Sequence, residues 1–158
     1  MLLAFSLAVA LLGAIPTYGP IPQPSPAAVP GVPKTSGEAL IVNSGSTNRA
    51  GYRLRVYAGG WTALQQGDVP IRKRVPRALI EHFFADLEAA GPLDKLPAAR
   101  CMKSASFGSS TQVGYRGTMS PDLGCPSPSV AARALAVDAD ALAAAAGVSM
   151  LPRPLTSP

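Results

Sequence analysis

Hydrophobic and polar residues follow a strand-like pattern through residues 39–66. The run 39–42 (ALIV) is apolar throughout, which is typical of a central strand. Residues 51–57 alternate, with Tyr52, Leu54 and Val56 at the apolar positions and Arg53, Arg55 and Tyr57 between them. This alternation predicts a strand in a sheet that is covered on one side only. Two glycines then favour a tight turn before a returning strand at 61–66.

A different spacing follows, and it predicts two helices separated by one more strand. After Pro76, apolar residues recur at helical intervals at Leu79, Ile80, Phe83, Phe84 and Leu87, until Gly91-Pro92 ends the helix. Alternation returns at 110–116 and predicts a fourth strand. Residues 127–147 predict a second, alanine-rich helix, capped by Ser127 or Ser129, with Pro128 in its first turn and Gly147 at its end.

These elements define an α+β domain. We predict a small antiparallel sheet of about four strands, with two main helices packed on one face, in the order βββ-α-β-α. If the strands at 39–42 and 110–116 are neighbours, the polar stretches next to them lie at the same end of the sheet.

The pattern also divides the chain into segments. Residues 1–14 hold an apolar run of about 14 residues, too short for the roughly 20 that a membrane helix needs, and suited to a signal peptide. Residues 15–37 contain seven prolines and predict a disordered linker. The single domain then covers 38–148, and 149–158 forms a flexible tail. We therefore expect an exported protein, periplasmic or extracellular, with no transmembrane segment in its mature chain.

The two cysteines agree with export. Cys101 and Cys125 form an even pair in an exported domain, which favours a disulfide. One histidine and no CxxC pair make a metal site a poor alternative, so we expect neither a metal nor another cofactor.

The motifs of the usual hydrolases are missing from the sequence. There is no GxSxG elbow and no SxxK. The only histidine, His82, lies in the first predicted helix, and Asp86 follows one turn later. A surface pair between these two side chains is the simplest interpretation, so the sequence points away from an enzyme.

Positive charge is concentrated between residues 49 and 77. The chain has 14 Lys and Arg against 9 Asp and Glu, a net charge of +5. Against the single acid Asp68, this region holds Arg49, Arg53, Arg55, Arg72, Lys73, Arg74 and Arg77. A basic surface of residues 49–77 would attract polyanions. Aromatic residues are too few here to indicate a specific nucleic-acid motif.

Two stretches of small hydroxyl residues, 43–48 (NSGSTN) and 103–110 (KSASFGSS), are the remaining candidates for a site. Such residues can cradle an anion, but turns use them as well, and a polar turn is the simpler interpretation. An enzymatic alternative would need Lys103 or Arg100 to activate Ser104. The candidate binding residues are Asn43, Ser44, Ser46, Thr47, Arg53, Arg55, Lys103 and Ser104.

Three sequence blocks carry a resemblance over roughly residues 39–146. They are NSGSTNRAGYRLRV, RALIEHFFADLEAAGPLDKLPAARCMKSASFG and SPDLGCP. The chain resembles a group of uncharacterised exported bacterial proteins with the same order of blocks. The resemblance implies export and paired cysteines, and it transfers no activity and no catalytic residue.

We therefore expect a non-catalytic binding or interaction module of the cell envelope, whose partner is an envelope protein or a polyanion. Polyanion binding through the basic surface of residues 49–77 is the first alternative. An enzyme that uses the stretches 43–48 and 103–110 is the second.

Overall fold

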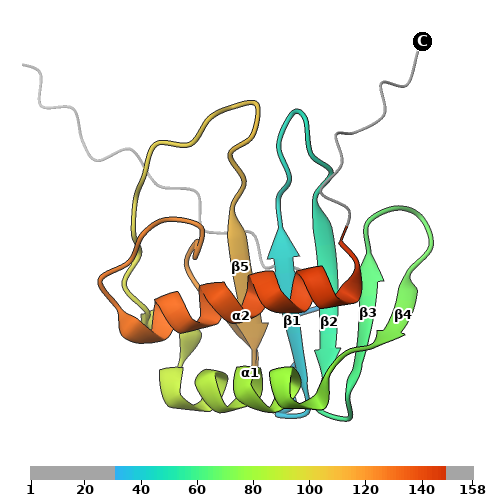
Figure 1. Cartoon of the computed structure of the whole chain (residues 1–158). Coiled ribbons are helices and arrows are strands. Elements are labelled where there is room, and N and C mark those ends of the chain that lie inside the picture. Colours follow the sequence, from blue (N-terminus) through green and yellow to red (C-terminus); the bar gives the residue numbers. More distant parts are fainter. Residues whose placement is uncertain (1–30, 149–158) are drawn as a thin grey trace, which may run out of the picture.

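A computed structural model describes residues 31–148. The expected signal peptide (1–14), the expected linker up to residue 30 and the expected tail (149–158) lie outside the described residues. Within 31–148 the chain forms an antiparallel sheet of six strands with two helices, so the α+β class is confirmed (Figure 1). The strands are β1 (Glu38–Asn43), β2 (Tyr52–Tyr57), β3 (Trp61–Gln65), β4 (Ile71–Arg74), β5 (Thr111–Tyr115) and β6 (Thr118–Met119).

The sheet has the order β4-β3-β2-β1-β5-β6. The apolar strand β1 is central, as its sequence predicts, and it pairs with β2 on one side and β5 on the other. The strands at 39–42 and 110–116 are therefore neighbours. Because both pairings are antiparallel, the chain leaving β1 and the chain entering β5 meet at the same end of the sheet.

The predicted count of four strands is wrong because two edge strands carry no strand-like pattern. β4 has the sequence IRKR, and all four of its residues are exposed. Backbone pairing with β3 makes this segment a strand. Because both sides of an exposed edge strand can be polar, its sequence shows no alternation of apolar and polar residues. β6 has only two residues, which pair with the end of β5 across a turn at Arg116 and Gly117. Both turn residues have positive φ, which suits a tight hairpin.

The helices are α1 (Arg77–Ala90) and α2 (Val130–Ala146), with a short 3-10 helix, η1 (Leu93–Lys95), after α1. Ser129 caps α2, because its side chain accepts a hydrogen bond from the amide of Ala132. Pro128 precedes this cap, so its expected place in the first turn is wrong. Gly147 ends the helix in the left-handed conformation, at φ 87°.

Both helices lie side by side across one face of the sheet (Figure 1). The core lies between them and the sheet, and Ile41, Leu54, Phe83 and Leu135 are completely buried there. Burying one such side chain stabilises the fold by about 1.5–3 kcal/mol. The alanines of α2 let that helix approach the strands closely. The opposite face of the sheet therefore has no helix over it within the described residues.

The described end of the proline-rich segment contacts the helix-free face near β5. The carbonyl of Pro33 accepts a hydrogen bond from the amide of Gly117, at 2.8 Å. A Cβ placed on Gly114 of β5 would lie 3.2 Å from Val32, so residue 32 covers the sheet at that position. Residue 31 reaches as far as β2, where its carbonyl accepts a hydrogen bond from Arg55 at 3.4 Å. Among residues 31–148, the open part of this face is therefore formed by the rest of β2 together with β3 and β4.

Candidate functional site

The two hydroxyl-rich stretches touch each other at one end of the sheet. The amide of Ser44 donates to the carbonyl of Ser110 at 2.9 Å, and the Ser44 hydroxyl accepts from the Ser110 amide at the same distance. The hydroxyl of Thr47 donates to the carbonyl of Ala105 at 3.1 Å. The stretch 43–48 therefore connects β1 to β2 and also packs against the stretch 103–110, so it is not an isolated turn. Local propensity describes the turn correctly but says nothing of the loop that lies opposite it.

Asn43 anchors this contact from the last position of β1. Its amide nitrogen donates to the Thr111 hydroxyl at 2.9 Å and to the Ser109 hydroxyl at 3.2 Å. Its side-chain oxygen accepts from the amide of Gly45 at 2.9 Å. Gly45 has φ 66°, and a Cβ there would lie 2.3 Å from the Gly51 nitrogen, so only glycine fits.

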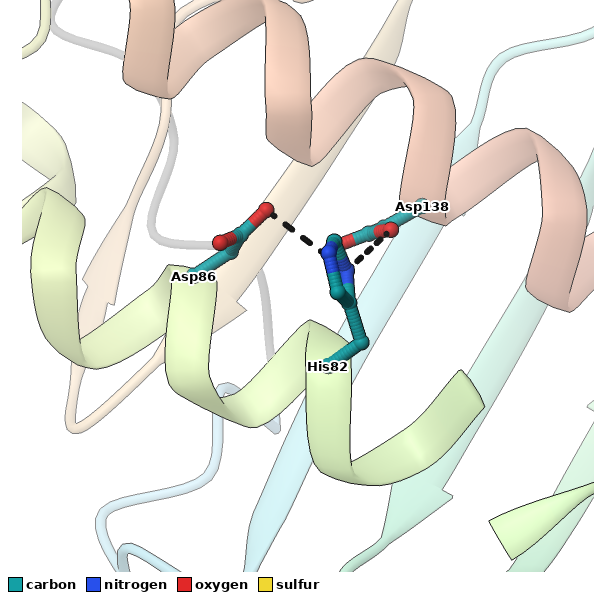
Figure 2. Close-up of side chains that lie close together, drawn as sticks. All are labelled: His82, Asp86 and Asp138. Carbon is teal, nitrogen blue, oxygen red and sulfur yellow. Dashed lines mark hydrogen bonds and ion pairs between the residues drawn. The ribbon is translucent and has the colours of Figure 1, made fainter. Parts of the chain in front are cut away.

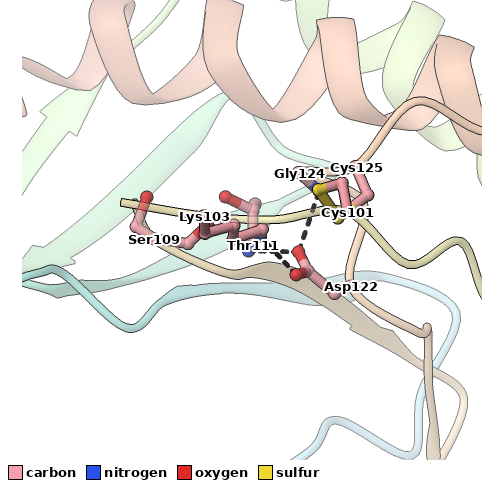
Figure 3. Close-up of a disulfide and its surroundings, with 7 residues drawn as sticks. All are labelled: Cys101, Lys103, Ser109, Thr111, Asp122, Gly124 and Cys125. Atoms are coloured by element: carbon pink, nitrogen blue, oxygen red, sulfur yellow. Dashed lines mark hydrogen bonds and ion pairs between the residues drawn. A yellow bond between two sulfur atoms is a disulfide. The ribbon is translucent and has the colours of Figure 1, made fainter. Parts of the chain in front are cut away.

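Lys103 fixes the second stretch beside the disulfide (Figure 3). Its ammonium forms an ion pair with Asp122 and donates to the carbonyl of Ser109 at 2.6 Å. Burial alone would raise the pKa of Asp122, but hydrogen bonds from Lys103, Gly124 and Thr111 outweigh it and lower that pKa. Within the described residues Lys103 is thus engaged by Asp122 and Ser109, an arrangement that does not favour its use as a base for Ser104.

The expected disulfide between Cys101 and Cys125 is present, with Cα atoms 5.6 Å apart. It joins the chain that follows η1 to the chain that precedes α2. Together with the Lys103–Asp122 ion pair it holds the 103–110 stretch against the rest of the domain.

A cleft of about 690 Å³ opens beside these loops. Residues that line it include Asn43, Arg49, Tyr52, Lys103, Phe107 and Asp140. Burial, with a smaller contribution from the Asp140 charge, raises the pKa of Tyr52 to about 12. Burial also raises the pKa of Asp140. A neutral phenol and a carboxyl at the wall give the cleft hydrogen-bonding groups, but His82, the only histidine, does not line it.

A second candidate surface is the face of β2, β3 and β4 over which the described residues place no helix. Direct antiparallel partners point to the same side of a sheet. The register pairs Arg55 with Ala63 and Ala63 with Arg72, and it pairs Trp61 with Arg74. On this side, which we call the arginine face, the strand residues are Arg53, Arg55, Tyr57, Trp61, Ala63, Gln65, Arg72 and Arg74.

The arginine face contains a hollow of about 270 Å³ whose lining includes Ala63. Its lining includes Arg53 and Arg55 at the sides and Leu40 on the neighbouring strand. Among the strand residues that point to this side of the sheet, Glu38 is the only acid, and it pairs with Arg55. Within residues 31–148, Arg53 and Arg72 make no side-chain hydrogen bond or ion pair. Arg74 stacks over Trp61, with its guanidinium carbon 4.7 Å from the ring centre.

The third cluster joins the two helices (Figure 2). His82 Nδ1 of α1 lies 3.0 Å and 3.2 Å from the two carboxylate oxygens of Asp138 on α2. The same nitrogen lies 3.8 Å from Asp86 Oδ2. Burial raises the pKa of the Asp138 carboxyl; the hydrogen bond from His82 opposes this rise, Asp86 adds to it, and the net change is upward.

The predicted surface pair of His82 and Asp86 is therefore incomplete. The ring makes its hydrogen bond to Asp138, because α2 packs against α1 and brings that carboxylate closer. One signal in the sequence could have shown this. Asp138 lies between Leu135 and Leu142 on the buried stripe of α2, a position that needs a polar partner.

The predicted binding residues divide between two places. Asn43, Lys103 and Ser104 line the cleft, while Ser44, Ser46 and Thr47 bond to the opposite stretch beside it. Arg53 and Arg55 lie instead on the arginine face. Sequence reasoning missed Tyr52 and Asp140 in the cleft, because distance along the chain hides their approach, and it did not single out Phe107 within the stretch 103–110.

Comparison with known proteins finds no family model that matches, no similar curated protein and no similar solved structure. None of the helices within residues 31–148 is long and apolar enough to cross a membrane.

Proposed function

We propose that the protein is an exported, non-catalytic binding module that holds acidic polymers on its arginine face. The observation that carries this proposal is the strand register, which brings Arg53, Arg55, Arg72 and Arg74 to one side of the sheet. Sequence alone shows these residues as a basic run, whereas the pairing makes them one continuous surface. Residues two apart on a strand lie about 7 Å apart, and strands lie about 4.8 Å apart.

The chemistry of this face suits phosphate, sulfate or carboxylate groups carried on a chain. Guanidinium groups bind such groups with two parallel hydrogen bonds, and they remain charged at any physiological pH. Arg53 and Arg72 have no competing side-chain partner among the described residues, so no internal ion pair must break before they bind. The small side chain of Ala63 lies in the lining of the hollow beside Arg53 and Arg55.

Export supports this function, because acidic polymers are abundant at cell surfaces and the Cys101–Cys125 disulfide suits an oxidising compartment. The resemblance to exported bacterial proteins belongs to the same proposal. N-terminal sequencing of the protein recovered from periplasm or medium tests it, and we expect a mature chain that begins between residues 15 and 30. An intact Met1 on cytoplasmic protein contradicts it.

Salt-dependent binding to immobilised heparin tests the ligand class. We expect the double variant Arg53→Gln/Arg72→Gln to elute at lower salt than the unchanged protein. For a single-stranded polyanion, the slope of log affinity against log salt should fall by about 1.4, since each lost contact contributes about 0.7.

The matched control is Arg77→Gln/Arg133→Gln. It removes the same charge from the two helices, where Arg77 and Arg133 lie on the other side of the sheet. We expect this control to elute close to the unchanged protein. Equal losses in both double variants would show that only net charge matters, and that result would contradict a site on the arginine face.

A further inference from the structure

The cluster between the helices combines one imidazole with two carboxylates. One potential ligand atom each from His82, Asp86 and Asp138 lies within 4.8 Å of the others. Two of these residues come from α1 and one from α2, so the cluster bridges the helix interface (Figure 2). The proposed binding on the arginine face makes no use of it, because the helices and that face are on opposite sides of the sheet.

The spacing of the atoms is close to that of a tetrahedral zinc site. Zinc binds imidazole nitrogen and carboxylate oxygen at about 2.0–2.2 Å, which puts neighbouring ligand atoms about 3.4 Å apart. His82 Nδ1 lies 3.0 Å from Asp138 Oδ1 and 3.8 Å from Asp86 Oδ2. These two separations lie on either side of the ideal value. The third separation, between the ligand atoms of Asp86 and Asp138, is at most 4.8 Å, so side-chain rotation must draw the two carboxylates around an ion.

The charge of the cluster is poorly balanced by the protein alone. The Asp138 side chain is only 6% exposed, and His82 is its one ion-pair partner within the described residues. Asp86 Oδ2 is covered from solvent and makes no hydrogen bond to any of the described residues. A covered carboxylate oxygen without a donor is costly, and a second carboxylate beside it adds repulsion. A divalent cation would satisfy both carboxylates at once.

We propose that His82, Asp86 and Asp138 bind a Zn²⁺ ion that links α1 to α2. His82 would bind through Nδ1, the ring nitrogen that faces both carboxylates, with the ring proton on Nε2. Any proton on Nδ1 in the metal-free protein would pass to solvent. The His82 side chain is 65% exposed, which leaves the fourth position of the ion open to water. An imidazole nitrogen and a total of three protein ligands suit zinc, whereas calcium takes six to eight oxygen atoms.

Titration of the tag-free, disulfide-bonded full chain with ZnCl₂ tests the site. Calorimetry should show one ion bound per chain. His82 is the only histidine, so the single imidazole signal in NMR spectra should move to a new position and saturate at the same stoichiometry. Bound metal should also raise the melting temperature, since the ion binds the folded chain in preference to the unfolded one. MgCl₂ should produce none of these effects.

Single substitutions assign the ligands. Asp138 is buried and its loss endangers the fold, so His82→Ala and Asp86→Asn are the variants to use. Each should weaken zinc binding by more than the roughly 10–100-fold that loss of an outer-shell partner costs. The matched control is Glu81→Gln, one residue before His82 on α1, where Glu81 pairs with Arg77 and away from the cluster. Its zinc affinity should be unchanged.

Three results would overturn the proposal. The first is the absence of one-to-one zinc binding by the unchanged chain. The second is undiminished binding by His82→Ala, which would place the metal elsewhere. The third is an equal response to magnesium, which would indicate attraction by charge alone.

Discussion

His82 Nδ1 on α1 lies 3.0 Å from Asp138 Oδ1 on α2, closer than the 3.8 Å that separates it from Asp86 one turn along its own helix. The hydrogen bond therefore links α1 to α2, whereas a bond to Asp86 would join two residues of the same helix. Because Asp138 is a buried carboxylate, its acceptor oxygens depend on this ring, and an ionised carboxylate can only accept.

The first prediction concerns the stability of this link in the absence of metal. With a chelator present, His82→Ala should lower the free energy of unfolding by about 1–3 kcal/mol, because it leaves a buried carboxylate without its donor. Urea denaturation measures the change. Glu81→Ala, which removes an exposed neighbour of similar size, should cost about 0.5 kcal/mol or less. Equal effects of the two substitutions would show that the Asp138 bond contributes nothing to stability.

The second prediction separates Asn43 from the exposed hydroxyls of its loop. Asn43→Ala should destabilise the domain by about 2–4 kcal/mol, because three part-buried hydrogen bonds are lost together. Ser46→Ala should cost about 1 kcal/mol or less, since its bond to the Ser106 carbonyl is exposed and water can replace it.

Asn43→Asp is the control within this experiment. It keeps the oxygen that accepts from Gly45 and removes the donor to Thr111 and Ser109, so its midpoint of unfolding should lie between those of Asn43→Ala and the unchanged chain. An Asn43→Ala variant as stable as Ser46→Ala would contradict the role of Asn43 as the anchor.

The third prediction concerns the disulfide. Cys101→Ser/Cys125→Ser should lower stability by about 3–4 kcal/mol, the amount that chain entropy gives for a closed loop of roughly 25 residues. Mass spectrometry of unreduced peptides should show one linked pair within each chain. Free thiols at both positions, or a link between chains, would contradict the structure of this region.

The fourth prediction follows from the raised pKa of Tyr52. Folding favours the protonated phenol, whose pKa rises from 10.0 to about 12. The associated stability is therefore complete below pH 10 and is lost as the pH rises through the interval from 10 to about 12. Spectrophotometric titration should show a tyrosine that ionises near pH 12, and Tyr52→Phe should remove that step. A titration that ends near pH 10 would place Tyr52 in contact with water.

Much of the fold could be predicted because short-range patterns encode it. The period-two run of β2 and the apolar stripe of α1 reflect which side of each element is buried. Each buried position requires an apolar side chain, so the spacing of apolar residues shows the type of element. Ser129 and Gly147 mark the ends of α2 for equally local reasons, since each satisfies backbone groups within a few residues. The cysteine pair followed from composition and the expected compartment.

The sequence by itself determined four of the six described strands, both long helices, the buried faces of these elements and the central place of β1. Only the tertiary structure decided which distant groups meet. β4 forms because its backbone hydrogen-bonds to the edge of β3. The same pairing brings Arg72 and Arg74 to the face that carries Arg53 and Arg55. The meeting of the two hydroxyl-rich stretches depends on β1 pairing with β5, and the His82–Asp138 bond depends on how α1 and α2 pack. Such contacts join residues far apart in the chain, so the local spacing of apolar and polar residues cannot predict them.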